Sequence, residues 1–219
     1  MKFLKVLGAA LALILVAFLG IAALLPAEYT VTRSQRIEAP PAIVFAQVND
    51  VKLWEGWSPW AAMDPSMQTT YGATHIGQGA SYSWTGDKVG NGQLTITSSS
   101  MADRIETHVT FDGQGEGNGE WTFVPDAGGT VATWTMRGSL PWPTARYIGP
   151  LMDRMLGPQF EDGLRRLQTQ AEADAKSLGG FGKVLGQGMQ ELGKELGKAL
   201  EEAGADMNKA MQDALNKAQ

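Results

Sequence analysis

The residues of this 219-residue chain that are suited to acid–base chemistry are few and scattered. The candidates are His75, His108, Asp64, Glu55, Glu106 and Tyr82. General acid–base catalysis needs such groups beside one reacting atom, and no two of these candidates have a spacing that predicts a catalytic pair. The chain has no cysteine and two histidines, which excludes thiolate chemistry and disfavours a histidine-rich zinc site. The sequence therefore assigns no catalytic residue, and we expect neither a metal ion nor a cofactor.

Tryptophan is the other residue type with an obvious use, and three of the seven indoles fall in the segment Trp54–Trp60 (WEGWSPW). Indoles combine a large apolar surface with one polar N–H group, and ligand pockets are usually lined by aromatic side chains with few polar groups. We predict that Trp57, Trp60 and Trp84 contact a cavity; ordinary core packing is the alternative. The full set predicted to line the ligand-binding cavity is Trp57, Trp60, Tyr82, Trp84, Arg33, Arg137 and Met152.

Arg33 and Arg137 belong to this set because both lie within strand patterns. From there either guanidinium could meet a ligand carboxylate or phosphate. The alternative is that both form ion pairs at the surface.

The glycine-rich run from Gly113 to Gly119 does not predict a nucleotide site. A dinucleotide-binding loop opens a helix, whereas Trp121 and Phe123 follow this run in a strand pattern. Glu116 and Glu120 would also repel a phosphate. We expect a hairpin loop here, placed at the mouth of the cavity.

Composition narrows the classes of partner. The net charge is −5, and no cluster of Lys and Arg alternates with aromatic residues, so we expect no nucleic-acid partner. About 150 residues lie between the two chain ends, which is enough for one domain with its own core.

The elements that position these residues follow from the pattern. Tyr29–Glu38 alternates as a strand does, and Pro40-Pro41 ends that strand and begins a helix. Asp50 is placed to cap a second short helix. From Gln68 onward six segments alternate with period two and are separated by turn residues, which predicts an antiparallel sheet with one packed face. A helix after Pro143 covers that face, and Gly157-Pro158 should kink or split it. The fold class is α+β, a helix-grip sheet wrapped on a C-terminal helix.

Both chain ends differ from this domain. Phe3–Leu25 is long and apolar enough to span a membrane, and Lys2 and Lys5 place its N-terminal side in the cytoplasm. We expect an uncleaved anchor in the bacterial inner membrane, with the following domain in the periplasm; a cleaved signal peptide is the alternative. In the C-terminal tail, residues 179–219, the spacing of apolar residues predicts an amphipathic helix. This helix either keeps the protein soluble or folds on a membrane or a partner helix. Its apolar side is Leu185, Met189, Leu192, Leu196, Leu200, Met207 and Met211.

Several runs together resemble a known superfamily. They include the segment from Glu28 to Trp60 and the later runs GQGASYSWTG, GGTVATWTM and MDRMLGPQFEDGL. They are similar to membrane-anchored bacterial members of the SRPBCC (START/Bet v 1-like) superfamily, described as polyketide cyclase/dehydrase-like. The resemblance spans about residues 28 to 173 and implies a deep apolar cavity between sheet and C-terminal helix. We expect three domains, at 1–27 (transmembrane anchor or signal peptide), 28–178 (START/Bet v 1-like) and 179–219 (amphipathic tail), and the tail lies outside the resemblance.

Together these features predict a protein that binds and sequesters or carries a hydrophobic ligand such as a lipid, isoprenoid or polyketide-like molecule beside the inner membrane. A cofactor-independent cyclase or dehydratase is one alternative. A scaffold that recruits a partner through its tail is another. The indoles of the tryptophan segment are suited to line a cavity and not to transfer protons, which favours binding over catalysis.

Overall fold

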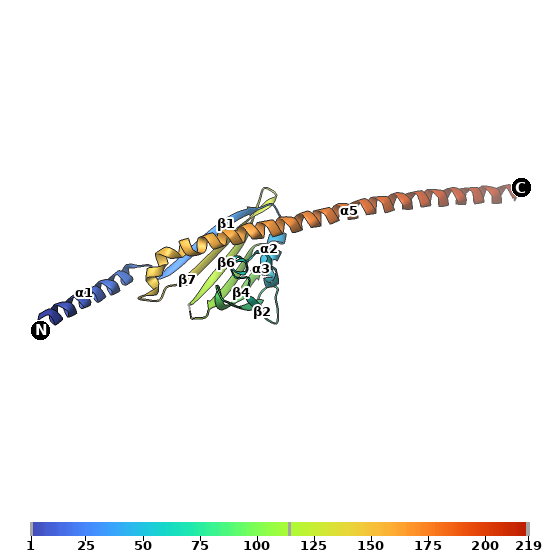
Figure 1. The fold of residues 1–219 in the computed structure, drawn as a ribbon. Helices are drawn as coiled ribbons and strands as arrows, with labels where there is room; N and C mark the ends of the chain where they lie inside the picture. Colours follow the sequence, from blue (N-terminus) through green and yellow to red (C-terminus); the bar gives the residue numbers. More distant parts are fainter. Residues whose placement is uncertain (1, 114, 218–219) are drawn as a thin grey trace. The chain divides into compact units, whose positions relative to one another are not determined.

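The protein is described by a computed structural model that covers residues 2–113 and 115–217. Its centre is a wholly antiparallel seven-stranded sheet in the order β1-β7-β6-β5-β4-β3-β2 (Figure 1). This confirms the predicted α+β helix-grip class and all seven predicted strands. The strands are β1 (Glu28–Ile37), β2 (Gln68–Tyr71), β3 (Ser81–Gly86), β4 (Gly90–Ser100), β5 (Arg104–Phe111), β6 (Gly115–Asp126) and β7 (Gly129–Ser139).

Short helices connect β1 to β2 and carry the tryptophan segment. They are α2 (Pro41–Asn49), the 3-10 turn η1 (Val51–Leu53), α3 (Trp54–Trp57) and α4 (Pro59–Met63). The predicted start of α2 is confirmed, since Pro41 needs no backbone N–H at a first helical position. The cap at Asp50 is confirmed as well, because its side chain accepts a hydrogen bond from the Lys52 N–H at 2.9 Å.

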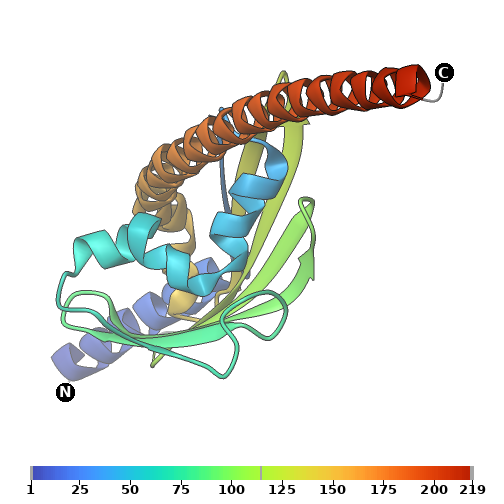
Figure 2. The same cartoon turned by 90° about the vertical axis from the view of Figure 1, so that its right-hand side faces the viewer.

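The C-terminal helix α5 (Met152–Lys217) follows a second 3-10 segment, η2 (Ala145–Leu151). Its first part covers the concave face of the sheet, and a β-bulge between Ile96 and Ser98 adds to the curvature of that face (Figure 2). Phe160, Leu164 and Leu167 of α5 are almost completely buried there. The core of the domain therefore lies between α5, α2 and the sheet.

The prediction that Gly157-Pro158 splits this helix is wrong, whereas a kink at these residues stays a prediction. Helix α5 is continuous from Met152 through both residues. Pro158 lies in the second turn, so it removes one backbone hydrogen bond near the helix end and leaves the rest intact. Gly157 lies directly beside the guanidinium at the end of the Arg33 side chain, which a Cβ at position 157 would displace.

The expected hairpin loop over Gly113–Gly119 is also wrong in its extent. Strand β6 already begins at Gly115, where it pairs with Phe111 of β5. The glycines serve close packing: a Cβ on Gly119 would overlap Thr107 Oγ1, and a Cβ on Gly117 would lie 2.9 Å from the Met136 sulfur. Gly117 and Gly119 therefore allow neighbouring side chains to cross the strand.

The remaining parts are the N-terminal helix α1 (Lys2–Leu24) and the tail. Helix α1 is long and apolar enough to cross a membrane. The chain divides into two compact units, residues 1–173 and 174–219. In the second unit no described side chain is buried, including the predicted apolar residues Leu185, Met189, Leu192 and Leu196. The side chains of Lys2, Leu200, Met207 and Met211, used in the sequence predictions, lie outside the described residues.

Candidate ligand-binding cavity

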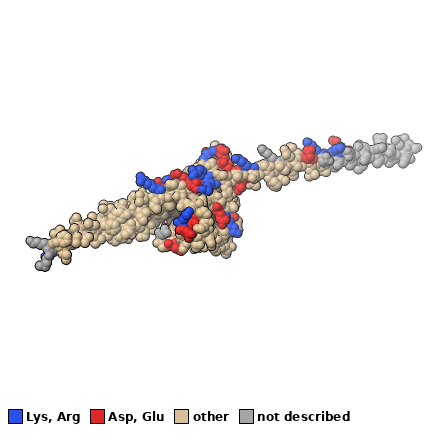
Figure 3. Space-filling model, in the orientation of Figure 1, with Lys and Arg blue, Asp and Glu red and all other residues tan. Residues whose placement is uncertain are grey.

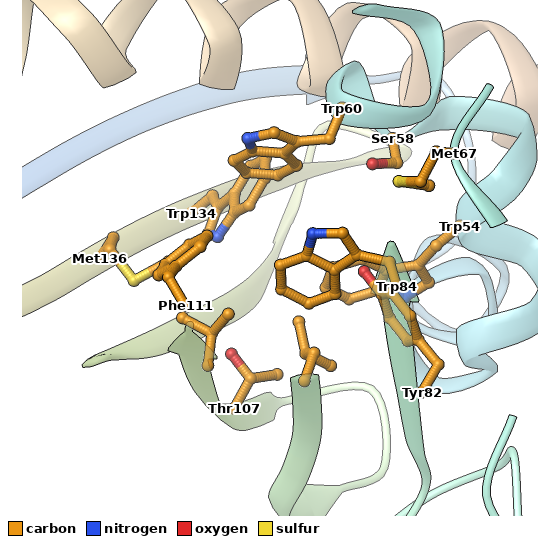
Figure 4. A pocket seen from close by; sticks show the side chains of 12 residues that line it. Trp54, Ser58, Trp60, Met67, Tyr82, Trp84, Thr107, Phe111, Trp134 and Met136 are labelled. Carbon is orange, nitrogen blue, oxygen red and sulfur yellow. The ribbon is translucent and has the colours of Figure 1, made fainter. Parts of the chain in front are cut away.

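An apolar cavity lies between the concave face of the sheet and the short helices α3 and α4 (Figure 4). Indoles, other apolar side chains and three hydroxyl-bearing residues form its wall. The lining residues are Trp54, Ser58, Trp60, Met67, Tyr82, Trp84, Leu94, Thr107, Val109, Phe111, Trp134 and Met136.

The cavity is small in this conformation. Its volume is about 40 Å³, which is room for only a few water molecules at roughly 10–15 Å³ each. A ligand with several carbon atoms therefore requires side chains of the wall to move apart. Trp60, Met67 and Phe111 are the half-exposed members of the wall, and methionine adapts its shape at low cost. They are the natural point of opening.

The tryptophan segment contributes both wall and core. Trp54, Ser58 and Trp60 line the cavity, whereas Trp57 is fully buried and is not part of its lining. The Trp57 Nε1–H donates to the backbone carbonyl of Gln47 at 3.2 Å, and the Trp54 Nε1–H donates to Val48 at 2.9 Å. Helix α2 therefore fixes the first two indoles, and Trp60 is the one held by side-chain packing.

Trp134 of β7 joins the cavity wall to α5. Its ring stacks on Phe160 with centroids 4.0 Å apart and on Trp121 at 4.4 Å. Trp60 meets the same indole edge to face at 5.4 Å. This aromatic stack makes the inner wall of the cavity rigid, because three elements hold a single ring.

The polar groups of the wall are neutral. No Asp, Glu, His, Lys or Arg is among the twelve lining residues; the hydroxyls of Ser58, Tyr82 and Thr107 and the N–H groups of the indoles are its only polar side-chain groups. Burial raises the pKa of the Tyr82 phenol well above its usual value. Tyr82 is therefore uncharged at neutral pH and can hydrogen-bond a ligand but cannot act as a base there.

Asp64 fixes the loops beside the cavity without lining it. Its carboxylate accepts hydrogen bonds from the Ser66 hydroxyl at 2.5 Å and from the backbone N–H of Lys88 at 2.7 Å and Val89 at 3.3 Å. The bond from Ser66, followed by those from the backbone, lowers the pKa of Asp64 to about 2. A buried carboxylate thus ties the end of α4 to the β3–β4 turn.

Besides Trp57, three further residues of the predicted cavity set do not line the cavity. Arg33 forms ion pairs with Asp153 at 2.8 Å and Glu161 at 2.7 Å, between β1 and α5. Arg137 pairs with Glu120 at 2.8 Å. Met152, at the start of α5, does not line the cavity. Both arginines thus form the ion pairs that the alternative interpretation expected, because α5 supplies carboxylates to Arg33 and the neighbouring strand β6 supplies one to Arg137.

The structure does not bring the acid–base candidates together either. His75 Nδ1 lies 2.9 Å from the Asp50 carboxylate, and His108 Nδ1 lies 3.0 Å from the Asn118 side chain on the outer side of the sheet. Glu55 accepts a hydrogen bond from the Tyr71 hydroxyl. Among the side chains that the structure describes, no three His, Asp or Glu residues are grouped as metal ligands would be.

Several wall residues were absent from the predicted set, although alternation points to most of them. Thr107 and Phe111 share the packed face of β5 with Val109, and Trp134 and Met136 share a face of β7. Alternation assigns such residues to the packed face but does not distinguish solid core from cavity wall. Met67, in the turn before β2, had no sequence signal.

Comparison with known proteins agrees with this geometry. A profile of the family described as "Polyketide cyclase / dehydrase and lipid transport" matches residues 28–172. The chain belongs to this family. The family match covers the sheet, the short helices and the first part of α5, and leaves out α1 and the tail. No curated protein matches the chain.

Solved structures agree with the family at the level of fold. Protein TTHA0849 from Thermus thermophilus is 19% identical with a TM-score of 0.50, over 67% of this chain and 99% of its own. Protein CV1439 from Chromobacterium violaceum is 16% identical with a TM-score of 0.50, over 65% of this chain and 96% of its own. At sequence identities this low, the two structures show that the fold is shared and nothing more.

Proposed function

We propose that this protein binds a hydrophobic ligand in the cavity beside the tryptophan segment and sequesters or carries it next to a membrane. The observation that carries the proposal is the cavity wall itself, which is built from indole, aromatic and aliphatic side chains with neutral hydroxyls. Transfer of apolar surface out of water supplies about 25 cal/mol per Å² of buried area. The ligand class that fits is a lipid, isoprenoid or polyketide-like molecule.

Binding explains the wall better than catalysis does. A cyclase or dehydratase moves protons, and such reactions use a side chain whose pKa lies near the working pH. The titratable lining residue is Tyr82, and burial raises the pKa of its phenol further. The cavity residues therefore favour retention of a ligand over its conversion.

Helix α1 supports a location at the membrane. Its 23 residues give a length of about 35 Å at 1.5 Å per residue, against a hydrocarbon core of about 30 Å. The proposed organisation is an inner-membrane anchor at residues 1–27, a periplasmic ligand-binding domain at 28–178 and a tail at 179–219. An anchored cavity meets its ligand at the high local concentration of the bilayer.

The test is identification of the bound molecule. Full-length protein is purified from membranes in mild detergent, extracted with organic solvent and analysed by mass spectrometry. Leu94→Trp places an indole inside the cavity, and Val124→Trp adds the same group at an exposed position of β6.

We expect wild type and Val124→Trp to carry the same apolar molecule, and Leu94→Trp to carry about tenfold less, a change of about 1.4 kcal/mol in binding. Wild-type protein that carries no apolar molecule, or equal loading of all three proteins, would contradict the proposal.

A further inference from the structure

We propose that η2, the loop before it and the first turn of α5 form a membrane-contact surface, which lies in the interfacial layer of the bilayer and holds the cavity mouth at the membrane. We define this surface by Trp142, Ile148, Leu151 and Met155. The inference rests on the proposed role of α1 as a membrane span. It adds to that role a specific contact between the folded domain and lipid.

The link between α1 and the domain is very short. Helix α1 ends at Leu24 and β1 begins at Glu28. The four steps from Cα to Cα between Leu24 and Glu28 reach at most about 14 Å in an extended chain. One headgroup layer is about 5–8 Å thick, so the start of β1 cannot lie far from the membrane surface when α1 spans it.

Contacts between α1 and η2 tighten this limit. The Tyr147 ring stacks on Phe18 with centroids 4.8 Å apart, and the Tyr147 hydroxyl donates to the Phe18 carbonyl. Phe18 lies six residues before the end of α1, about 9 Å along the helix axis. A segment that touches Phe18 of a membrane-spanning α1 must itself lie near the edge of the hydrocarbon layer.

The composition of η2 suits that depth. Apart from Arg146 and Tyr147 its side chains are apolar (ARYIGPL). Arg146 donates to the Ala22 carbonyl at 3.3 Å, and the Tyr147 hydroxyl is bonded to Phe18. Both polar side chains are thus turned toward α1, which reduces the cost of placing this segment beside lipid.

Four apolar side chains are exposed along this segment, next to the exposed Asp153 and Arg154 in the first turn of α5, and Asp153 is paired with Arg33. Trp142, Ile148, Leu151 and Met155 are each about half exposed, from 47% for Ile148 to 57% for Met155. Tryptophan is enriched at membrane–water interfaces. Figure 3 shows an uncharged surface over most of α1, with charged side chains gathered farther along the domain. The membrane-contact surface therefore continues the apolar surface of α1.

Strand register places the cavity mouth at the same end of the sheet. Glu28, the first residue of β1, pairs with Ser139 at the end of β7. Three wall residues lie toward this end: Phe111 is the last residue of β5, Trp84 is two residues from the end of β3, and Met136 is three residues before Ser139. Exposed Lys88 and Asp112, at the tips of the β3–β4 and β5–β6 turns, keep that side of the mouth at headgroup level. A lipid therefore reaches the cavity from the bilayer surface.

Spin-label accessibility tests the contact directly, and the absence of cysteine makes single-site labelling clean. Full-length protein with Ile148→Cys, Leu151→Cys or Met155→Cys is labelled and reconstituted into vesicles of phosphatidylethanolamine and phosphatidylglycerol. Collision with oxygen, which concentrates in lipid, is compared with collision with a water-soluble nickel chelate. Leu13→Cys reports the interior of α1. Met101→Cys, an apolar residue that is 84% exposed at the opposite end of the sheet, is the matched control.

We expect labels at positions 148, 151 and 155 to collide several-fold more with oxygen and several-fold less with the nickel chelate than the label at position 101. If the label at position 13 is lipid-exposed while those at 148 and 151 behave like 101, the membrane-contact surface is overturned and the anchored ligand-binding function stands. If the label at position 13 is itself exposed to the chelate, the anchor fails and the surface fails with it. Neither readout depends on ligand loading, which extraction measures separately.

Discussion

At the scale of single residues, the indoles of Trp54–Trp60 divide between packing and cavity wall. Trp57 has no exposed surface and packs edge to face on Trp121 at 5.6 Å, whereas Trp60 is half exposed at the opening of the cavity. Substitutions at these two positions should therefore differ in kind. A substitution of Trp57 should lower the stability of the fold, whereas a substitution of Trp60 should alter the cavity wall that a ligand contacts.

Trp57→Ala should lower the free energy of unfolding by about 3–5 kcal/mol, because it removes a large buried side chain and leaves a void. Urea unfolding of the full-length protein in mild detergent measures this. Val124→Ala, at an exposed position of β6, is the control and should stay within about 0.5 kcal/mol of wild type. Equal losses in the two variants would show that Trp57 is not a core residue.

Asp64 should make stability depend on acid. Its pKa of about 2 in the folded protein lies below the ordinary aspartate value of 3.8, so the unfolded chain binds its proton more readily. The stabilisation is then complete above about pH 5 and is lost as the pH falls through 4 toward 2.

Asp64→Asn should be less stable than wild type at pH 7, and the difference should shrink at pH 3. Thermal unfolding at both values measures it, with Asp87→Asn on the adjacent turn as the control. A difference that stays constant with pH would contradict this role of the carboxylate.

At the scale of elements, close packing between strands shapes the cavity. Glycine at position 119 of β6 leaves space for the Thr107 side chain of β5, which lines the cavity. The same logic applies to Gly163 of α5, where a Cβ would lie 2.9 Å from Pro59 of α4. Glycines at these crossings let the sheet, α4 and α5 approach closely enough to enclose the indoles.

A double-mutant cycle tests the first crossing. Gly119→Ala should cost about 1–3 kcal/mol of unfolding free energy because its Cβ overlaps Thr107 Oγ1. Thr107→Ala removes that oxygen, and the remaining Cβ is 3.7 Å away. The double variant should therefore be more stable than the sum of the single effects predicts. Additive losses, measured by chemical unfolding, would mean that Thr107 does not limit the space at position 119.

At the scale of the whole molecule, the family domain and the two chain ends are distinct in composition and burial. The last buried residue of α5 is Ala171 among the side chains that the structure describes. The stripe Leu185, Met189, Leu192 and Leu196 is exposed in its own unit. Two interpretations of the tail stay open as predictions. It either folds on a membrane or a partner helix, or it keeps the protein soluble.

Truncation after Leu178 should leave the unfolding midpoint of the domain unchanged, within about 0.5 kcal/mol, because no described side chain beyond that point is buried. Loading with the extracted apolar molecule should also match that of the full-length protein. Loss of either property, measured by calorimetry and by mass spectrometry of the extract, would assign the tail a role in the domain.

Much of this architecture could be predicted from local signals in the sequence. Alternation, the prolines and the cap at Asp50 predicted the number of strands and the start of α2, because backbone geometry and side-chain period are local properties. The start of β6 at Gly115 was missed, because glycine carries no such signal. The same alternation assigned Tyr82, Trp84 and Thr107 to the packed face. The sequence has seven tryptophans and no spaced pair of acid–base residues, and this already favoured binding over catalysis.

The tertiary structure decided what local pattern does not contain. Only the register between strands brings Phe111, Trp84 and Met136 to the end of the sheet where α1 enters. Only tertiary packing on α2 and on Trp121 of β6 places Trp57 in the core, while Trp60 lies in the cavity wall. Arg33 looked like a ligand contact until Asp153 and Glu161, more than a hundred residues away, came within ion-pair distance. Such pairings depend on the sum of many weak contacts across the whole fold, which no single stretch of sequence records.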